Sequence, residues 1–342
     1  MQEKIGNVTL DYEYYPGEDL YSDGPVEEEL LEIAKNYQEK ELNQLIYERN
    51  SWPVLYHFSH IRQNILEWLP ITKEQKVLEI GSGCGPITGV LARKAKSVTC
   101  IDLSKMRSTI NAYRNRECDN VKIMVGNFQD VESSLTEKYD YITLIGVFEY
   151  SQGYIGTAQP YVEMLRRIAR HLAPGGRIVI AIENRLGLKY WAGARADDHG
   201  FSKKMLETLL GTDGETSWYY PMPDIKVPVT IFSDEYLPGK GDLTDTITAY
   251  DYPKYLLMDV GEAYDRVCAD GQFDQYANGY LVIWSAGETG CAKAVGAAGE
   301  TGAAGAAATG DAEVLPQAHI QYVKYNRTRR EEFQIRTTIY GD

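Results

Sequence analysis

Three glycines at alternate positions are the feature of this sequence with the clearest chemical meaning. Gly81, Gly83 and Gly85 follow the apolar run 77–80 and precede a segment, 87–95, whose composition suits a helix. Glycine permits a sharp turn between a strand and a helix, and it lets backbone N–H groups approach a ligand closely. We therefore predict that residues 81–85 form a ligand-binding loop.

The residues around this loop narrow the kind of ligand. The dinucleotide fingerprint requires a third glycine where this sequence has Pro86, so a pyrophosphate site is disfavoured. Glu79 precedes the loop, and a carboxylate is a better neighbour for a cation than for a phosphate. Asp102 ends a second apolar run, close to the ~20-residue offset at which a βαβ unit places an acid on a ribose diol. A ligand that has a ribose and a positive charge but no pyrophosphate indicates S-adenosylmethionine.

The same residues resemble the glycine motif of the class I methyltransferases, Glu/Asp-x-Gly-x-Gly-x-Gly. Further blocks that resemble the family follow in family order at 126–130, 140–146 and 172–180, so the resemblance covers about residues 70–185. It implies S-adenosyl-L-methionine as the cofactor and an adenine-contacting turn at Asn127 and Phe128. The cofactor-binding residues predicted in this way are Glu79, Gly81, Ser82, Gly83, Gly85, Asp102, Leu103, Asn127, Phe128 and Gly146.

Short apolar runs alternate with helical stretches through the centre of the chain. The runs near 76–80, 97–101, 121–125, 139–145 and 177–182 predict parallel strands, and the passages 217–228 and 280–284 would supply two more. This order is typical of an α/β fold with a doubly wound, mostly parallel, seven-stranded sheet. Ligands bind beyond the carboxyl ends of such strands, which is where the predicted cofactor residues stand.

The composition of the chain on both sides of this core suggests that the chain has four parts, the core domain included. We predict an N-terminal helical extension or lid at 1–69, a methyltransferase domain at 70–285, a Gly/Ala-rich flexible linker at 286–317 and a C-terminal β-hairpin at 318–342. Within the extension, helices are expected at 26–46, capped by Ser22 or Asp23, and at 56–68. Arg62 on the second helix would either contact the cofactor carboxylate or be an ordinary solvated or ion-paired arginine.

Polar and aromatic side chains crowd the segment after the fifth strand, as a substrate pocket requires. We expect an acceptor site formed by Tyr150, Asn184, Arg185, Lys189 and Tyr190. If the acceptor is a hydroxyl, a base would help to remove its proton, and Glu149, Glu183 and His199 are the candidates by position. Each of the three also has an ordinary structural explanation, so the choice among them stays open.

Residues 182–193 and the segment 14–21 resemble a bacterial group of methyltransferases that occur alone or joined to glycosyltransferases of surface-polysaccharide biosynthesis. That resemblance implies a glycan acceptor and an association with a glycosyltransferase. A shorter segment after His199 and the unusual tail distinguish this sequence from the group.

Composition excludes several classes of partner. The formal charge is −14, and residues 1–50 alone hold 13 acids against 4 bases, which opposes binding to nucleic acid. No apolar run is long enough for a membrane span, and the N-terminus lacks the regions of a signal peptide. Five scattered cysteines indicate reduced thiols in a cytoplasmic protein, and no spacing of histidines and acids indicates a metal.

The leading hypothesis is an S-adenosylmethionine-dependent methyltransferase that acts on a small molecule or glycan, at oxygen. Two alternatives stay open: a non-catalytic cofactor-binding or scaffold module of a surface-polysaccharide pathway, and a protein methyltransferase.

Overall fold

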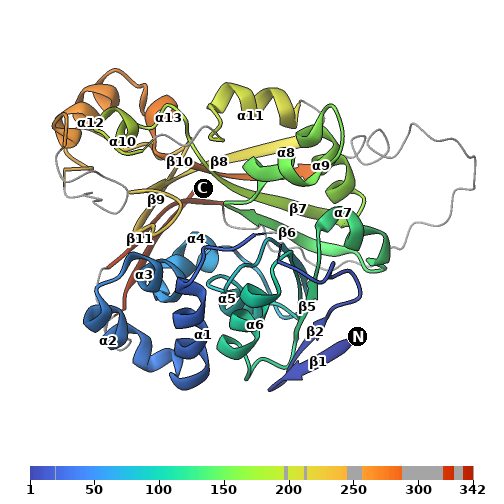
Figure 1. Cartoon of the computed structure of the whole chain (residues 1–342). Helices are drawn as coiled ribbons and strands as arrows, with labels where there is room; N and C mark the ends of the chain where they lie inside the picture. Colours follow the sequence, from blue (N-terminus) through green and yellow to red (C-terminus); the bar gives the residue numbers. More distant parts are fainter. Residues whose placement is uncertain are drawn as a thin grey trace, which may run out of the picture.

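The computed structural model describes residues 1–19, 21–195, 199–211, 214–244, 256–286, 319–326 and 334–341. These residues form a twelve-stranded sheet with helices on both faces (Figure 1). In spatial order the strands are β1 (Gln2–Ile5), β2 (Val8–Asp11), β5 (Val121–Val125), β4 (Ser97–Asp102), β3 (Lys76–Ile80), β6 (Tyr139–Ile145), β7 (Leu172–Glu183), β10 (Gly279–Ala286), β8 (Gly214–Met222), β9 (Thr230–Ser233), β11 (Ile320–Tyr325) and β12 (Arg336–Tyr340).

The centre of the sheet has the predicted α/β character. Neighbouring strands from β2 through β5, β4, β3 and β6 to β7 are parallel, and β10 is antiparallel to both β7 and β8. The predicted count of seven strands was too low, because β1, β2, β9, β11 and β12 extend the sheet at its two edges. Added strands satisfy backbone groups that an open sheet edge would leave unpaired.

Helices cover both faces of the sheet, as expected for a doubly wound fold. In Figure 1, α5 and α6 lie below the sheet, and α9 and α11 lie above it. The helical segments are α1 (Val26–Asn36), α2 (Glu39–Arg49), α3 (Trp52–Phe58), η1 (His60–Gln63), α4 (Asn64–Glu67), α5 (Thr88–Lys94), α6 (Lys105–Arg114), α7 (Phe128–Val131), η2 (Glu132–Ser134), η3 (Phe148–Tyr150), α8 (Ser151–Tyr154), α9 (Pro160–Ala169), α10 (Leu188–Trp191), α11 (Lys203–Leu210), α12 (Val260–Ala269) and α13 (Phe273–Tyr276).

The N-terminal region contains two strands besides the helices that the sequence predicted. It begins with β1 and β2, and the buried side chains of Val8 and Leu10 join the core beneath the sheet. The single helix expected at 26–46 is two helices. The backbone is extended at Tyr37 and Gln38, so α1 ends at Asn36 and α2 begins at Glu39. The Glu41 carboxylate accepts a hydrogen bond from the Gln38 backbone N–H at 2.8 Å, which caps α2.

Neither Ser22 nor Asp23 caps α1, contrary to the prediction. The N-cap is Pro25, and the Glu27 carboxylate accepts hydrogen bonds from the Ser22 hydroxyl (2.7 Å) and the Asp23 backbone N–H (3.0 Å). The helix expected at 56–68 is also divided. It becomes α3, η1 and α4, since the extended backbone of Ser59 ends α3 and its hydroxyl caps η1.

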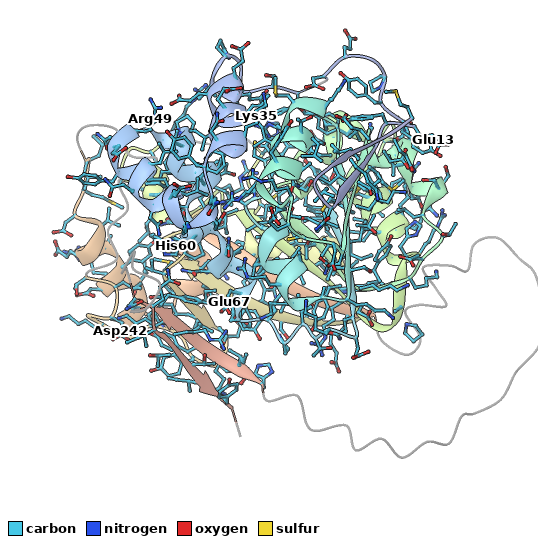
Figure 2. The ribbon with its side chains drawn as sticks, turned by 90° about the horizontal axis from the view of Figure 1, so that it is seen from below. Glu13, Lys35, Arg49, His60, Glu67 and Asp242 are labelled. Carbon is cyan, nitrogen blue, oxygen red and sulfur yellow. The ribbon has the colours of Figure 1, made fainter. Side chains whose placement is uncertain are left out.

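The last two strands, β11 and β12, form an antiparallel pair beside β9. Glu67, labelled in Figure 2, joins this pair to α4: it accepts hydrogen bonds from Arg336 at 2.6 Å and from the Tyr325 hydroxyl at 3.2 Å. Apart from Ala286, the predicted linker 286–317 lies outside the described residues, so the proposed part boundaries remain predictions. In the described part of the chain, no helix is long and apolar enough to cross a membrane.

Candidate active site

A cavity of about 500 Å³ lies beyond the carboxyl ends of β3, β4 and β6. The core contributes Gly81, Ser82, Gly83, Asp102, Leu103 and Gly146 to its wall. A smaller cavity of about 60 Å³ shares Gly81, Asp102 and Leu103 with it and adds Asn127 and Phe128. Eight of the ten predicted cofactor residues therefore line one of two adjoining cavities, whereas Glu79 and Gly85 line neither.

The three glycines of the loop have different physical tasks, although all adopt positive φ angles of +72°, +52° and +73° in chain order. A Cβ on Gly81 would lie 2.4 Å from Val147 Cγ2, and one on Gly85 would lie 2.3 Å from Asn111 Oδ1. Nothing lies within 4 Å of the Cβ position of Gly83, which lines the large cavity. Gly81 and Gly85 therefore permit close packing, and Gly83 leaves open space for a ligand.

Asp102 connects the glycine loop to the end of β4. One carboxylate oxygen accepts a hydrogen bond from the Gly83 N–H at 2.7 Å, and the other accepts from the Ser104 N–H at 2.9 Å. The side chain is buried at the boundary of both cavities, and burial raises its pKa. A carboxylate in this place can accept hydrogen bonds from a ribose diol.

The smaller cavity is a slot with a mainly apolar wall, which suits a flat base. Phe128 and Ile155 are buried there, and the Asn127 side-chain amide donates to the Tyr154 carbonyl at 3.1 Å. This contact fixes the turn after β5 against α8. The arrangement agrees with the adenine-contacting role that the resemblance implied for residues 127–128.

Glu79 lies beneath the loop, between β3 and α5, and does not face the ligand space. Its Oε2 accepts hydrogen bonds from the Thr88 hydroxyl (2.6 Å) and the Cys100 thiol (3.4 Å), and burial raises its pKa to about 7. We predicted that Glu79 stands beside a cationic ligand because it closely precedes the first glycine in the sequence. The alternation of side chains along β3 directs it to α5 instead.

This burial predicts a pH-dependent contribution to stability. A carboxyl whose pKa is higher in the folded state binds its proton more tightly there, so stability falls as pH rises from 4.5, the ordinary value, to about 7. Relative to Glu79→Gln, which does not titrate, the wild type should lose up to about 3 kcal/mol across this window, at about 1.4 kcal/mol per pH unit. Urea unfolding of both proteins at several pH values measures the difference. An offset between them that is independent of pH would contradict the prediction.

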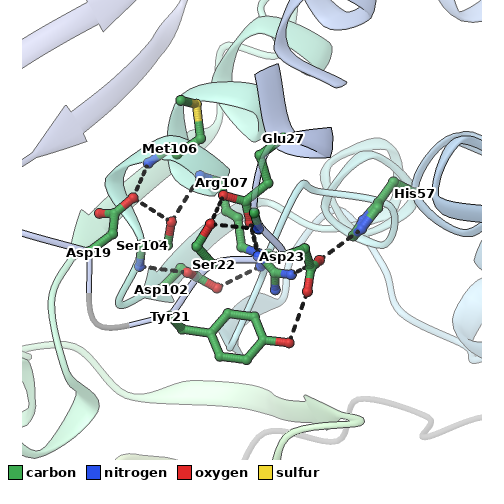
Figure 3. Close-up of polar contacts among 12 residues, drawn as sticks. Asp19, Tyr21, Ser22, Asp23, Glu27, His57, Asp102, Ser104, Met106 and Arg107 are labelled. Carbon is green, nitrogen blue, oxygen red and sulfur yellow. Dashed lines mark hydrogen bonds and ion pairs between the residues drawn. The ribbon is translucent and has the colours of Figure 1, made fainter. Parts of the chain in front are cut away.

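The N-terminal strap, which we define as residues 19 and 21–26, lies between the start of α6 and the wall of the large cavity. Asp19 accepts hydrogen bonds from the Ser104 hydroxyl (2.9 Å) and from the N–H groups of Lys105 (2.6 Å) and Met106 (3.0 Å), at the start of α6 (Figure 3). Tyr21, Asp23 and Val26 line the large cavity. The sequence predicted an acidic turn here with Ser22 or Asp23 as a helix cap, and no local signal indicated that Tyr21 and Asp23 line a cavity.

Helices α3 and η1 complete the wall with Trp52, Tyr56, His57 and Arg62. Arg62 is 4 % exposed; its guanidinium donates to the Lys226 carbonyl at 2.8 Å and lies 4.3 Å from the centre of the Tyr56 ring. Its Nε is buried without a hydrogen-bond partner, and none of the described acidic side chains forms an ion pair with it. A buried cation without a counter-charge is costly, so the site favours an anionic ligand group.

One of the five residues predicted to bind the acceptor lines the large cavity. Tyr150 lines the large cavity, and its ring centre lies 5.4 Å from that of His199. Asn184, Arg185, Lys189 and Tyr190 are not among the residues lining it. The Asn184 amide donates to two backbone carbonyls at 2.8 and 2.7 Å, which ties the end of β7 to the segment after α13.

Lys189 and Tyr190 are held by Glu183 instead. Lys189 is 1 % exposed, its Nζ lies 2.6 Å from Glu183 Oε2, and the Tyr190 hydroxyl donates to the same carboxylate. Arg185 points to Met205, with 3.8 Å between its Nη1 and the sulfur. Glu183, Lys189 and Tyr190 thus interact with one another inside the fold, and none of the three lines the large cavity.

The three candidate bases lie outside the wall of the large cavity. Glu183 forms ion pairs with Lys189 and Lys226. Burial by itself would raise the pKa of the Glu183 carboxyl, but the two lysines outweigh burial and lower it. Glu149 is buried in η3, and its backbone carbonyl accepts a hydrogen bond from the Tyr161 hydroxyl at 3.2 Å. His199 is exposed beside Tyr150. None of the three is among the residues that line the large cavity.

Comparison with known proteins identifies the class. Residues 55–227, just over half of the chain, match the family described as "Methyltransferase domain". The chain therefore belongs to the methyltransferase domain family. Its α/β core is that of a class I methyltransferase, and its cofactor is S-adenosyl-L-methionine, as the loop and Asp102 predicted.

Relatives and solved structures are distant. The chain is 23 % identical over 204 residues to ribosomal RNA small subunit methyltransferase A of Alkaliphilus metalliredigens, which covers 57 % of this chain and 63 % of the relative. The chain is also 30 % identical over 100 residues to the same enzyme of Borreliella afzelii, a match that covers 29 % of this chain and 34 % of the relative. The chain thus spans less than two thirds of these relatives.

The solved structures that resemble the chain include two N-methyltransferases. Phosphoethanolamine N-methyltransferase 1 of Haemonchus contortus is 16 % identical with a TM-score of 0.43, covering 79 % of this chain and 52 % of its own. N-methyltransferase NodS of Bradyrhizobium japonicum with S-adenosylhomocysteine is 15 % identical with a TM-score of 0.41. This match covers 76 % of the present chain and 98 % of the NodS chain.

The residues present suit the cofactor. Open space at Gly83, the buried Ser82 hydroxyl without a hydrogen-bond partner and the Arg62 guanidinium offer polar contacts for an amino acid. Asp102 and the slot at Phe128 suit the ribose and the base. Among the described residues, no group of three histidine, cysteine or acidic side chains could hold a metal ion.

A substitution of Arg62 tests whether the amino-acid end of the cofactor lies beside this residue. Arg62→Gln should weaken S-adenosylhomocysteine binding by about 10- to 100-fold, because a hydrogen bond to a charged group contributes about 1.5–3 kcal/mol. Binding of 5′-methylthioadenosine, which lacks the amino-acid end, should stay within about threefold of wild type. Calorimetry measures both, with Arg93→Gln as the control arginine outside the cavity. Equal weakening of the two ligands would contradict the assignment.

Proposed function

We propose that this methyltransferase acts on a small-molecule or glycan-type acceptor, at oxygen. The observation that supports it is the aromatic part of the wall of the large cavity, whose 500 Å³ the cofactor and the acceptor would share and which lies within the range of about 300–1,000 Å³ typical of small-molecule sites. Trp52, Tyr56 and Tyr150 line it beyond the glycine loop. Aromatic faces can stack on the apolar face of a sugar or another ring.

Charge supports the same choice over a nucleic acid. The curated relatives are named as ribosomal RNA methyltransferases, but RNA binding depends on lysines and arginines that neutralise phosphates, and this chain has a net charge of −14. Of the two arginines in the cavity wall, Arg107 is ion-paired to Asp23 and Glu27. Association with a glycosyltransferase and a cytoplasmic location remain predictions from the sequence.

The protein's own contribution is alignment and exclusion of water. The cofactor supplies a methyl group on a positively charged sulfur, which makes the carbon open to attack by an acceptor oxygen. The glycine loop and Asp102 would orient the donor, and the N-terminal strap with α3 would hold the acceptor in line with it. Fixed alignment in a water-poor cavity provides most of the acceleration that such a displacement needs.

Calorimetry with S-adenosylmethionine, followed by S-adenosylhomocysteine release with a panel of nucleotide sugars, monosaccharides and oligosaccharides, tests the proposal. We expect binding, and turnover with a hydroxyl acceptor. Absence of binding to folded protein would end the proposal. Parallel reactions with a ribosomal RNA transcript and with cell-lysate peptides separate the other acceptor classes, and methylation of RNA or peptide alone would replace the proposed acceptor. Binding without turnover in every arm would favour the scaffold alternative.

A further inference from the structure

Two side chains of the N-terminal strap give the large cavity an aromatic ring and a carboxylate side by side. Tyr21 and Asp23 both line the cavity, and the Tyr21 hydroxyl donates to Asp23 Oδ1 at 3.1 Å (Figure 3). Tyr21 is 42 % exposed and the side chain of Asp23 is 34 % exposed, whereas Asp102 and Arg62 in the same wall are buried. The pair is therefore accessible to a ligand.

Several contacts hold the ring of Tyr21 in place. The Arg107 guanidinium lies over the ring, 4.3 Å from its centre, and the Glu27 carboxylate accepts a hydrogen bond from Arg107 Nε at 2.9 Å. Asp19 separately ties the strap to the start of α6. Because Arg107 covers one face of the ring, the other face is the one open to a ligand, and a flat group can pack on it without the cost of ordering the ring.

The Asp23 carboxylate can accept a further hydrogen bond. Its Oδ2 faces the Arg107 guanidinium and His57 Nε2, the latter at 3.6 Å, and its Oδ1 accepts from the Tyr21 hydroxyl. Each oxygen of a carboxylate can accept about two hydrogen bonds, so Oδ1 has room for one more donor. The hydrogen bond from His57, against the effect of burial, lowers the pKa of Asp23 to about 2, so the carboxylate is ionised at neutral pH.

We propose that Tyr21 and Asp23 form the acceptor subsite and that the acceptor is an uncharged sugar. The apolar face of the sugar ring packs on Tyr21, and one of its hydroxyls donates to Asp23 Oδ1, which leaves the other hydroxyls to face the cofactor. A hydrogen bond to an ionised carboxylate is about twice as strong as one between neutral groups, and aromatic faces suit apolar ring surfaces. The inference rests on the proposed function and names the class of its acceptor.

The charges beside this subsite disfavour an anionic acceptor. Asp23 and Glu27 carry two negative charges, and Arg107, which is ion-paired to both, carries one positive charge. His57 adds no charge near neutral pH, because burial lowers its pKa. Arg62, the other arginine of the wall, is assigned to the cofactor. A phosphate or carboxylate on the acceptor would therefore meet a net negative charge and be repelled, so a neutral saccharide fits better than a nucleotide sugar.

The first test measures binding and needs no turnover. Saturation-transfer NMR of the full-length protein with S-adenosylhomocysteine and the neutral monosaccharides of the panel should show transfer to the C–H protons of a bound sugar. Tyr21→Ala should abolish this transfer, although Asp19 keeps the strap on α6, and Tyr21→Trp should bring it back because it restores an aromatic face. Tyr47→Ala, at an exposed tyrosine outside the cavity, is the control. No transfer to any neutral sugar, or transfer that persists in Tyr21→Ala, would overturn the inference.

The second test separates the KM for the acceptor from kcat. Tyr21→Ala should raise the KM of the preferred sugar about 3- to 10-fold, and Asp23→Asn about 10- to 100-fold, since the first removes an aromatic contact and the second a hydrogen bond to a charged group. S-Adenosylmethionine affinity should stay within about twofold in both variants. Asp119→Asn, at an exposed turn, is the control for Asp23→Asn. A fall in kcat at unchanged KM, or an equal loss of cofactor affinity, would contradict an acceptor subsite.

The third test pairs each neutral monosaccharide with its uronic acid, because the two differ in charge at one carbon. Wild-type kcat/KM should favour the neutral member by at least about tenfold, and this preference should shrink in Asp23→Asn and at high salt. A nucleotide sugar as the preferred acceptor, or a preference of the same size in Asp23→Asn, would show that Asp23 does not select the acceptor.

Failure of this inference is distinct from failure of the proposed function. If the wild type methylates a hydroxyl acceptor while Tyr21→Ala and Asp23→Asn keep its KM, the inference is wrong and the function stands. If the wild type methylates no hydroxyl acceptor, the proposed function fails, and so does the role of Tyr21 and Asp23.

Discussion

Replacing Gly83 with valine is expected to abolish cofactor binding while the protein still folds. At φ +52° an added side chain costs roughly 1–2 kcal/mol of backbone strain, but nothing lies within 4 Å of its Cβ position. The valine would extend into the space that the amino-acid end of S-adenosylmethionine needs. We therefore expect affinity to fall by more than about 100-fold, about 2.7 kcal/mol, in calorimetry.

Gly175 offers a control with the same backbone strain. It has a φ angle of +72°, nothing within 4 Å of its Cβ position, and a place at the start of β7 away from the two cavities. Gly175→Val should lower the melting temperature by an amount similar to Gly83→Val and leave cofactor binding unchanged. Equal affinities for the two variants would show that the loop does not hold the cofactor.

Asp102→Ala is expected to have the second-largest effect, a loss of about 100-fold in S-adenosylmethionine affinity. The substitution removes the acceptor proposed for the ribose hydroxyls, and each hydrogen bond to a charged group contributes about 1.5–3 kcal/mol. It also leaves the Gly83 and Ser104 N–H groups without the carboxylate that connects them. The glycine loop should become looser, which can be measured as faster amide exchange at residues 81–85.

Two comparisons isolate the role of the Asp102 carboxylate. Asp119→Ala, at an exposed turn before β5, should bind the cofactor as the wild type does. Adenosine lacks the amino-acid end but has the ribose, so its affinity should also fall in Asp102→Ala; an unchanged adenosine affinity would contradict ribose binding by this residue. Together with the Arg62 test, this measurement assigns the two ends of the cofactor to different residues.

Much of the core could be predicted because its signals are local. The alternation of short apolar runs with helical stretches depends on neighbouring residues, and it located β3 to β7 within a few positions. The glycine loop and Asp102 are separated by one strand–helix–strand unit, whose parallel strands β3 and β4 pair side by side. Fold class and cofactor therefore followed from the sequence.

The acceptor side could not be predicted in the same way, because long-range contacts form it. The ion pair between Arg107 and Glu27 joins residues 80 positions apart, and it brings the strap and its Asp23 to the cavity. The polar block after β7 was equally misleading, since Lys189 and Glu183 satisfy each other inside the fold.

The residues by themselves determined a class I methyltransferase core and its S-adenosyl-L-methionine loop, since glycine conformation and strand periodicity are properties of short segments. Only the tertiary structure decided which polar side chains face the cavity. A side chain's burial and charge partners depend on packing between distant segments, and this packing placed His57 and Asp23 in the wall and Glu79 and Glu183 outside it.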